Sequence, residues 1–257
     1  MGNNKRKAVL IAVDLESGAN DMELVLINKL NFQPKNILKL SNHQTDPLLI
    51  PSRVNIIKAL CWLVLDAAPE DTFFLYYGNA RQKPCSNRKN SEKRGVIYPI
   101  DYEKSGVIYS EELINLIVIP IPQETRLISF MDSCICKTDL GLSYTRTCNN
   151  TSLKICSALK LLFGSKRSIR RPIKPAGTAI FFSGFIHNEK PIVTNVDKEG
   201  GCTMTCAFIK CIEKHYARLT YSKTLKLMYS LIKCSGSKPT LYISSTHYLD
   251  PNEQFYV

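Results

Sequence analysis

The sequence predicts an α/β fold, a three-layer sandwich in which helices cover both faces of a six-stranded, mostly parallel sheet. Two observations predict this fold class. Short apolar runs alternate along the chain with segments whose apolar residues recur at helical spacing. Some of these runs, including 73–77 and 127–131, end abruptly on polar residues, as buried parallel strands do at the edge of a sheet. We expect a single domain over residues 1–257, with residues 1–6 as an N-terminal tail.

The predicted strands are short apolar runs without strict alternation, a pattern typical of strands that are buried on both faces. They are residues 8–13, 36–40, 73–77, 127–131, 178–183 and 241–244. The chain contains no internal repeat, no Walker loop and no Gly-x-Gly-x-x-Gly turn, which argues against a nucleotide-binding protein of the same layout.

Helical spacing predicts helices at 22–30, after Ser52, from Ser110, at 204–215 and at 221–232. We expect Asn20 and Asp21 to cap the first helix and Ser110 to cap the third. The second helix is predicted to bury one face that consists of Val54, Ile57, Cys61 and Val64.

Residues 139–176 are polar and basic, and they are predicted to form a loop-rich insertion. Only 153–163 within this stretch has the composition of a short helix.

The net charge of +12 is concentrated in three short stretches. Residues 5–7 contribute +3, and residues 81–94 and 166–174 contribute +5 each, so the remainder is close to neutral. No aromatic residue interrupts the second and third stretches, as stacking on nucleic-acid bases requires. Solvated basic loops are therefore favoured over a nucleic-acid-binding surface.

The ten cysteines are better explained as reduced thiols than as a disulfide framework, because no export signal precedes them. Most are expected in or near the core. Cys202 and Cys211 fall on opposite faces of a helix, so no zinc site is predicted. No apolar run approaches the ~20 residues that a bilayer span requires. These features favour a cytoplasmic protein without a membrane segment.

The stretch 127–136 carries the candidate chemistry. Its apolar part is a predicted strand, and the polar Asp132-Ser133-Cys134 emerges where this strand ends. Because ligands of open α/β sheets bind beyond the carboxyl ends of the strands, Cys134 stands where a nucleophile could act.

Asp132-Ser133-Cys134 after an apolar strand resembles the Asp-Ser-Cys-His-Ser-Gly nucleophile motif of metacaspases, the caspase-fold cysteine peptidases of fungi, protists and plants. Residues 76–82, Tyr-Tyr-Gly-Asn-Ala-Arg-Gln, are similar to the family's Tyr-Ser-Gly-His-Gly-Gly-Gln histidine motif. Further similar stretches are 51–53, 62–64, 97–101, 207–210 and 244–247. The resemblance extends from about residue 7 to the C-terminus and implies a caspase-like sheet.

The resemblance implies a Cys–His dyad that cleaves peptides after Arg or Lys, usually with calcium activation. Cys134 matches the nucleophile, and Asp132 matches the acid that helps to line the pocket for the basic residue. The dyad histidine is replaced by Asn79. Asparagine cannot exchange protons near neutral pH, and losing a general acid–base typically removes a factor of ~10²–10⁴ in rate.

Other departures from the family pattern agree with this loss. Ile135-Cys136-Lys137 stands in place of His-Ser-Gly, where the backbone would stabilise an oxyanion. The segment that is acid-rich in calcium-dependent relatives corresponds to 83–94, which contains a single Glu. Calcium needs several oxygen ligands, so we expect the calcium site to be lost and no cofactor to be bound. The family's second acidic pocket would fall near 187–189, where only Glu189 is anionic.

Three interpretations follow. The leading one is a metacaspase-like pseudopeptidase that binds a peptide or protein, for example by competing with an active relative for substrates. The alternative is a residually active Arg/Lys-specific cysteine endopeptidase that uses Cys134, with either His187 or a group of the substrate acting in place of the missing base. A basic nucleic-acid-binding module ranks last, because it rests on charge alone. We expect a monomer.

Overall fold

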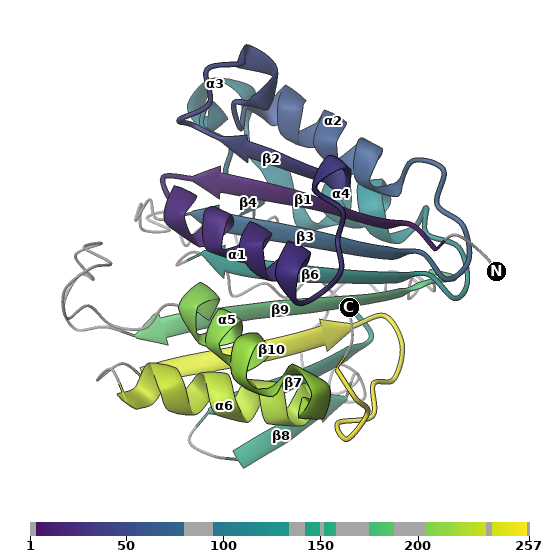
Figure 1. The fold of residues 1–257 in the computed structure, drawn as a ribbon, viewed down its shortest axis with the longest axis vertical. Coiled ribbons are helices and arrows are strands. Elements are labelled where there is room, and N and C mark those ends of the chain that lie inside the picture. The colour runs from purple at the N-terminus through teal and green to yellow at the C-terminus, as the bar shows by residue number, and fades with distance from the viewer. Residues whose placement is uncertain are drawn as a thin grey trace, which may run out of the picture.

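The computed structural model describes residues 4–79, 95–133, 142–149, 152–157, 175–187, 204–234 and 238–255 (Figure 1). Its main sheet has the strand order β2-β1-β3-β6-β9-β10-β7-β8. The strands are β1 (Arg6–Val13), β2 (Ile37–Ser41), β3 (Thr72–Asn79), β6 (Arg126–Ser133), β7 (Tyr144–Asn149), β8 (Ser152–Ser157), β9 (Thr178–His187) and β10 (Lys238–Ser245). The five strands from β2 to β9 are parallel, and the last three are antiparallel to their neighbours.

All six predicted strands are present, and the mixed, mostly parallel α/β architecture is confirmed. Two strands of the main sheet were not predicted. β7 and β8 form an antiparallel hairpin that extends the sheet beyond β10. The expectation of loops is therefore wrong for these two segments of 139–176, and the expected helix is wrong over 153–157, which belongs to a strand. A second small sheet pairs β4 (Gly95–Ile97) with β5 (Ile108–Tyr109).

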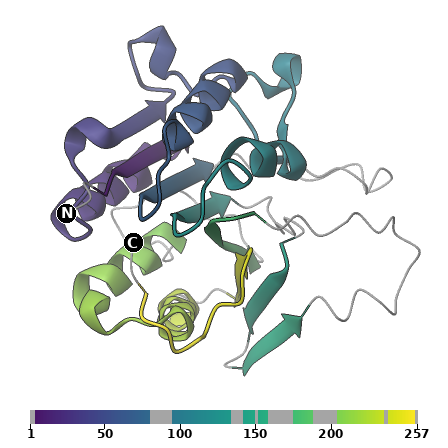
Figure 2. The same ribbon diagram turned by 90° about the vertical axis from the view of Figure 1, so that its right-hand side faces the viewer.

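Helices cover both faces of the sheet (Figures 1 and 2). The longer ones are α1 (Glu16–Asn28), α2 (Arg53–Val64), α5 (Met204–His215) and α6 (Tyr221–Cys234), and the short ones are η1 (Pro34–Asn36), η2 (Pro47–Leu49), α3 (Tyr102–Ser105), α4 (Ser110–Leu113), η3 (Ile114–Val118) and η5 (Tyr216–Arg218). α1, α5 and α6 pack on one face, and α2, α4 and η3 pack on the other. No helix in the described ranges is long and apolar enough to cross a membrane.

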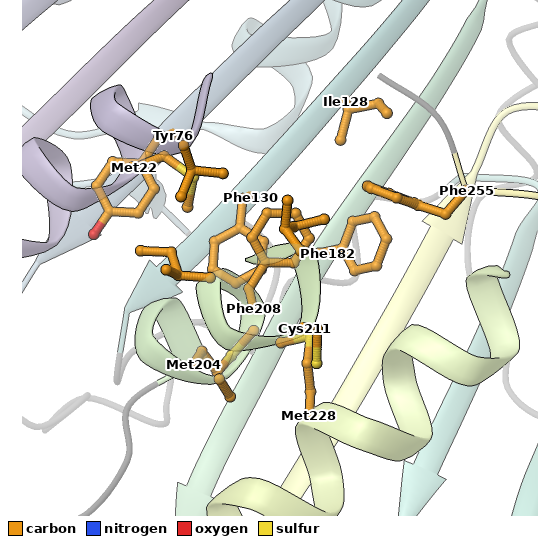
Figure 3. Packing of buried hydrophobic residues seen from close by; sticks show 14 of the residues in the cluster. Met22, Tyr76, Ile128, Phe130, Phe182, Met204, Phe208, Cys211, Met228 and Phe255 are labelled. Atoms are coloured by element: carbon orange, nitrogen blue, oxygen red, sulfur yellow. The ribbon is translucent and has the colours of Figure 1, made fainter. Parts of the chain in front are cut away.

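Aromatic packing fills the core beneath α1, α5 and α6 (Figure 3). The ring of Phe130, at the centre of β6, lies 4.6 Å from that of Phe208 on α5 and 6.2 Å from that of Phe182 on β9, between ring centroids. Tyr76 of β3 stacks on Phe130 from the other side, at 6.4 Å. These contacts join the two strands that carry the candidate site to the helix α5.

Helix α2 begins as predicted but buries a different face. The Ser52 hydroxyl accepts a hydrogen bond from the backbone N–H of Asn55, which caps the helix. The predicted face is wrong, because Val54 is 57% exposed and Cys61 is also exposed. The side chains that enter the core are Ile56, Ala59, Leu60, Leu63 and Val64.

The predicted N-terminal caps of two other helices are wrong. α1 begins at Glu16, so Asn20 and Asp21 lie inside the helix and do not cap it. Ser110 is the first residue of α4, and its N-terminus has no side-chain cap. The remaining two predicted helices are present as α5 and α6.

The corrected face of α2 is testable by truncating one residue from each face. Leu60→Ala should lower the free energy of unfolding by about 2–5 kcal/mol, because it opens a cavity in a closed core. Val54→Ala should change it by less than about 0.5 kcal/mol. Urea unfolding followed by circular dichroism measures both, and a larger loss for Val54→Ala than for Leu60→Ala would show that the face first predicted is the buried one.

Candidate functional site

The candidate site lies where β3 and β6 end side by side. Parallel strands carry their carboxyl ends to one edge of the sheet, and in this pair Gly78 is opposite Asp132 and Asn79 is opposite Ser133. Cys134 is the next residue after β6, and it lies outside the described residues. The structure therefore brings Asn79 beside the residue that precedes Cys134, as the resemblance requires, without placing the thiol itself.

Asn79 and Asp132 direct their side chains to opposite faces of the sheet. Asn79 shares its face with Tyr77, which belongs to the core beneath α2. Asp132 instead bonds to Thr205 on α5, on the face that contains Phe130. Successive side chains along a strand point to opposite faces of the sheet, so the ends of two neighbouring strands can place polar side chains on both faces.

The Asn79 side chain is held in place and nearly closed off from solvent. Its Nδ2 donates to Tyr77 Oη over 2.7 Å, and the residue is only 4% exposed. Tyr77 Oη also accepts from the backbone N–H of Tyr98, at 3.0 Å, and donates to the Tyr98 carbonyl, at 3.4 Å. The residue that the resemblance matches to the dyad histidine is thus a hydrogen-bonded amide, which neither takes up nor releases a proton near neutral pH.

Asp132 is held by donors from the first turn of α5. Its Oδ2 accepts from the backbone N–H of Thr205, at 2.9 Å, and from the Thr205 hydroxyl, at 2.5 Å. Burial raises the pKa of Asp132, and the two hydrogen bonds from Thr205 lower it by less than burial raises it. The carboxylate is consequently maintained at a cost in folding stability.

Tyr76 completes the group on this face. Its Oη lies 3.1 Å from Thr205 Oγ1. Because the Thr205 hydroxyl proton is directed to Asp132, Tyr76 is the donor in this bond. Burial, followed by the charge of Asp132, raises the pKa of Tyr76 well above its ordinary value, so the phenol stays protonated and able to donate. Sequence reasoning missed Thr205, since no motif marks a residue 73 positions beyond its partner.

Other histidines show different surroundings. His187 is the last residue of β9, which pairs with β6, but its side chain lies outside the described part of the chain. His215, expected on an apolar helix face, is exposed. His247 follows β10, which is antiparallel to β9, so it lies at the opposite edge of the sheet. His43 follows β2 and approaches Glu16, two strands away from β3.

Two further expectations concern thiols and metals. Cys148 and Cys211 are buried, whereas Cys61 and Cys234 are exposed. Core placement is thus correct for some and wrong for others. Within the described ranges, no group of three His, Cys, Asp or Glu side chains could hold a metal ion. Cys202 and both long basic stretches, 81–94 and 166–174, lie outside those ranges.

Comparison with known proteins agrees with the fold and the motifs. A family model described as "Metacaspase, peptidase C14 domain" matches residues 6–143. Metacaspase-1 of Saccharomyces cerevisiae is 26% identical over 98% of this chain and 68% of its own length. Metacaspase-1 of Arabidopsis thaliana is 27% identical over 91% of this chain and 66% of its own length. The crystal structure of protein GSU0716 from Geobacter sulfurreducens has the same fold, with a TM-score of 0.59 at 14% identity, covering 97% of this chain and 96% of that one.

The α/β sandwich and the two strand-end motifs define a caspase-like protein of the cysteine-peptidase class. Since the family model matches more than half of the chain, the chain belongs to the metacaspase family.

Replacing Asp132 with asparagine tests whether the charge of Asp132 destabilises the folded protein. Asp132→Asn keeps an oxygen that can accept both Thr205 hydrogen bonds and removes the desolvation of a charge. A carboxyl with a raised folded pKa loses stability as pH rises through the interval between the unfolded and folded pKa values. We therefore expect the variant to melt at a higher temperature at pH 7, and this advantage to disappear on acidification below the usual carboxyl range. A variant less stable at pH 7 would contradict this account.

Proposed function

We propose that this protein is a catalytically impaired member of its family, which binds peptides at the edge formed by β3 and β6 without hydrolysing them efficiently. Asn79 is the observation that carries the proposal. It occupies the position of the dyad histidine, and its amide is committed to Tyr77 Oη.

The chemistry of cysteine peptidases explains why this position matters. A thiol near its usual pKa of ~8.5 is only a few per cent thiolate at pH 7, and the dyad histidine both activates it and protonates the leaving amine. An amide can orient a group through hydrogen bonds but supplies neither step. Cys134 would thus remain a thiol beside a binding crevice.

Binding without cleavage gives the protein two plausible activities. It could compete with an active relative for Arg- or Lys-containing substrates, with Asp132 as the acid that contacts the basic residue. It could also present its basic stretches to an acidic partner. Calcium is not expected to contribute, because residues 81–94 carry six basic side chains and one Glu.

One observation favours residual activity as the second candidate. β9 pairs in parallel with β6 and ends on His187, at the sheet edge where β6 ends before Cys134. A histidine there would stand one strand away from β6 and could serve as the base for Cys134, which would make the protein a weak endopeptidase.

A peptidase assay separates the two candidates. Purified protein with fluorogenic Arg and Lys peptides, with and without calcium, should give no turnover above that of Cys134→Ala. Turnover that Cys134→Ala abolishes would refute the proposed function. Its loss in His187→Ala would then identify the replacement base.

Introducing a histidine at position 79 tests whether the rest of the site can still support peptide cleavage. An imidazole Nδ1 is attached to Cγ as the Asn79 Nδ2 is, so it can take over the bond to Tyr77 Oη and leave Nε2 as the base. Asn79→His should raise cleavage after Arg or Lys by about 10²-fold or more. Asn79→Gln, which adds no base, serves as the control and should show no gain.

Tyr77 provides the matching second variant. Adding Tyr77→Phe to Asn79→His removes the acceptor that fixes the imidazole, so we expect about a tenfold lower kcat with a smaller change in KM. If the folded Asn79→His variant remains inactive, the histidine is not the only missing element, and the changed sequence after Cys134 no longer supports catalysis either.

A further inference from the structure

We propose that Thr205 is a positioning residue for recognition of basic peptides: it fixes Oδ2 of Asp132 so that Oδ1 receives the guanidinium or ammonium group of the ligand. The inference deepens the proposed function and rests on it, because it assumes a peptide-binding crevice at this edge of the sheet. It assigns a role to a residue that lies outside both motifs.

The two oxygens of the Asp132 carboxylate have different surroundings. Oδ2 accepts both hydrogen bonds from Thr205, at 2.5 and 2.9 Å. Among the described residues, no donor contacts Oδ1, and the side chain is only partly buried. One oxygen is thus anchored while the other is available. Recognition of a planar guanidinium depends on such an oriented carboxylate.

Thr205 is itself held from behind by Tyr76. The Tyr76 phenol donates to Thr205 Oγ1, which occupies a lone pair of that oxygen and directs its proton to Asp132. Two glycines make room for the phenol. A Cβ at Gly78 would lie 2.5 Å from Tyr76 Oη, and one at Gly18 would lie 2.7 Å from it. The chain of hydrogen bonds from Tyr76 through Thr205 to Asp132 therefore requires glycine at position 78, because a Cβ there would collide with the Tyr76 phenol oxygen.

The backbone of Thr205 adds a second anchor. Thr205 is the second residue of α5, so its N–H belongs to the first turn, where helical N–H groups have no partner within the helix. Asp132 satisfies this N–H from the neighbouring strand, and its negative charge is favoured at the positive end of the helix dipole. Substitutions of the side chain leave this contact intact, which isolates the contribution of the hydroxyl.

The test compares two peptides that differ only in charge. An acetylated tetrapeptide amide ending in arginine and the same peptide ending in citrulline, its neutral isostere, are titrated into the full chain by calorimetry. All variants carry Cys134→Ala, so the result does not depend on cleavage. The parent should bind the arginine peptide at least about tenfold more tightly than the citrulline peptide.

Thr205→Val should reduce this selectivity to a few-fold and leave the affinity for citrulline unchanged. Thr205→Ser, which keeps the hydroxyl, should retain it. Tyr76→Phe should give a smaller loss, because it acts through Thr205. Thr224→Val is the matched control, since Thr224 is a buried threonine of α6 whose hydroxyl donates to the Thr220 carbonyl, away from the site.

Carboxyl ¹³C NMR of the unliganded protein gives a readout that needs no peptide. Because the Thr205 side-chain bond lowers the pKa of Asp132, Thr205→Val should raise that pKa further, and Thr205→Ser should not. The inference is overturned if folded Thr205→Val keeps both the parent's selectivity and its Asp132 titration, or if the parent binds both peptides equally. Neither outcome bears on whether the protein cleaves peptides, which the peptidase assay decides separately.

Discussion

The central strands of this protein are buried on both faces, and this constraint decides where polar chemistry can lie. β1, β3 and β6 contribute side chains alternately to the two cores, so a polar group in mid-strand has no water to bond. Ser129, in the middle of β6, illustrates the cost, since its buried Oγ has no partner among the described residues. Only where the strands end do Asn79 and Asp132 reach donors and acceptors of other elements. The site lies at this edge because both faces of the central strands are covered by apolar side chains elsewhere in the sheet.

The motif around Tyr76 gains a physical explanation from the packing. Tyr76 has an aromatic body that stacks on Phe130 and a hydroxyl that reaches Thr205, so one residue serves both the core and the site. The hydroxyl passes over Gly78, where any side chain would collide with it. Gly18 has the same function from α1, which explains why a glycine is accommodated inside that helix. Sequence similarity identifies Tyr76 and Gly78 as part of a motif. The contacts show that this motif positions the Tyr76 hydroxyl against Thr205.

The six strands were predictable because continuous apolar runs have few alternatives in a chain of this length. The β7–β8 hairpin was not, since β7 is a half-exposed strand of polar residues near the edge of the sheet, which lacks such a run. The buried face of α2 was ambiguous for the opposite reason. That helix is apolar around most of its circumference, so helical spacing fits both Val54 and Leu60, and only packing against the sheet selects Leu60. At the site, the motifs located Asn79 and Asp132, whereas the Thr205 contact depends on tertiary structure.

Asp132 and Asn79 together support the proposal that this site binds peptides without cleaving them efficiently. A partly buried carboxylate whose pKa is raised by desolvation costs folding stability, and an asparagine there could accept the same Thr205 hydrogen bonds without that cost. Under the same proposal, Asn79 is a change of the opposite kind, because its amide donates a hydrogen bond to Tyr77 but cannot transfer a proton. A site with no remaining use would have no reason to keep a costly charge. A site that recognises the basic side chain of a peptide without cleaving the peptide needs the charge of Asp132 but does not need a histidine at position 79.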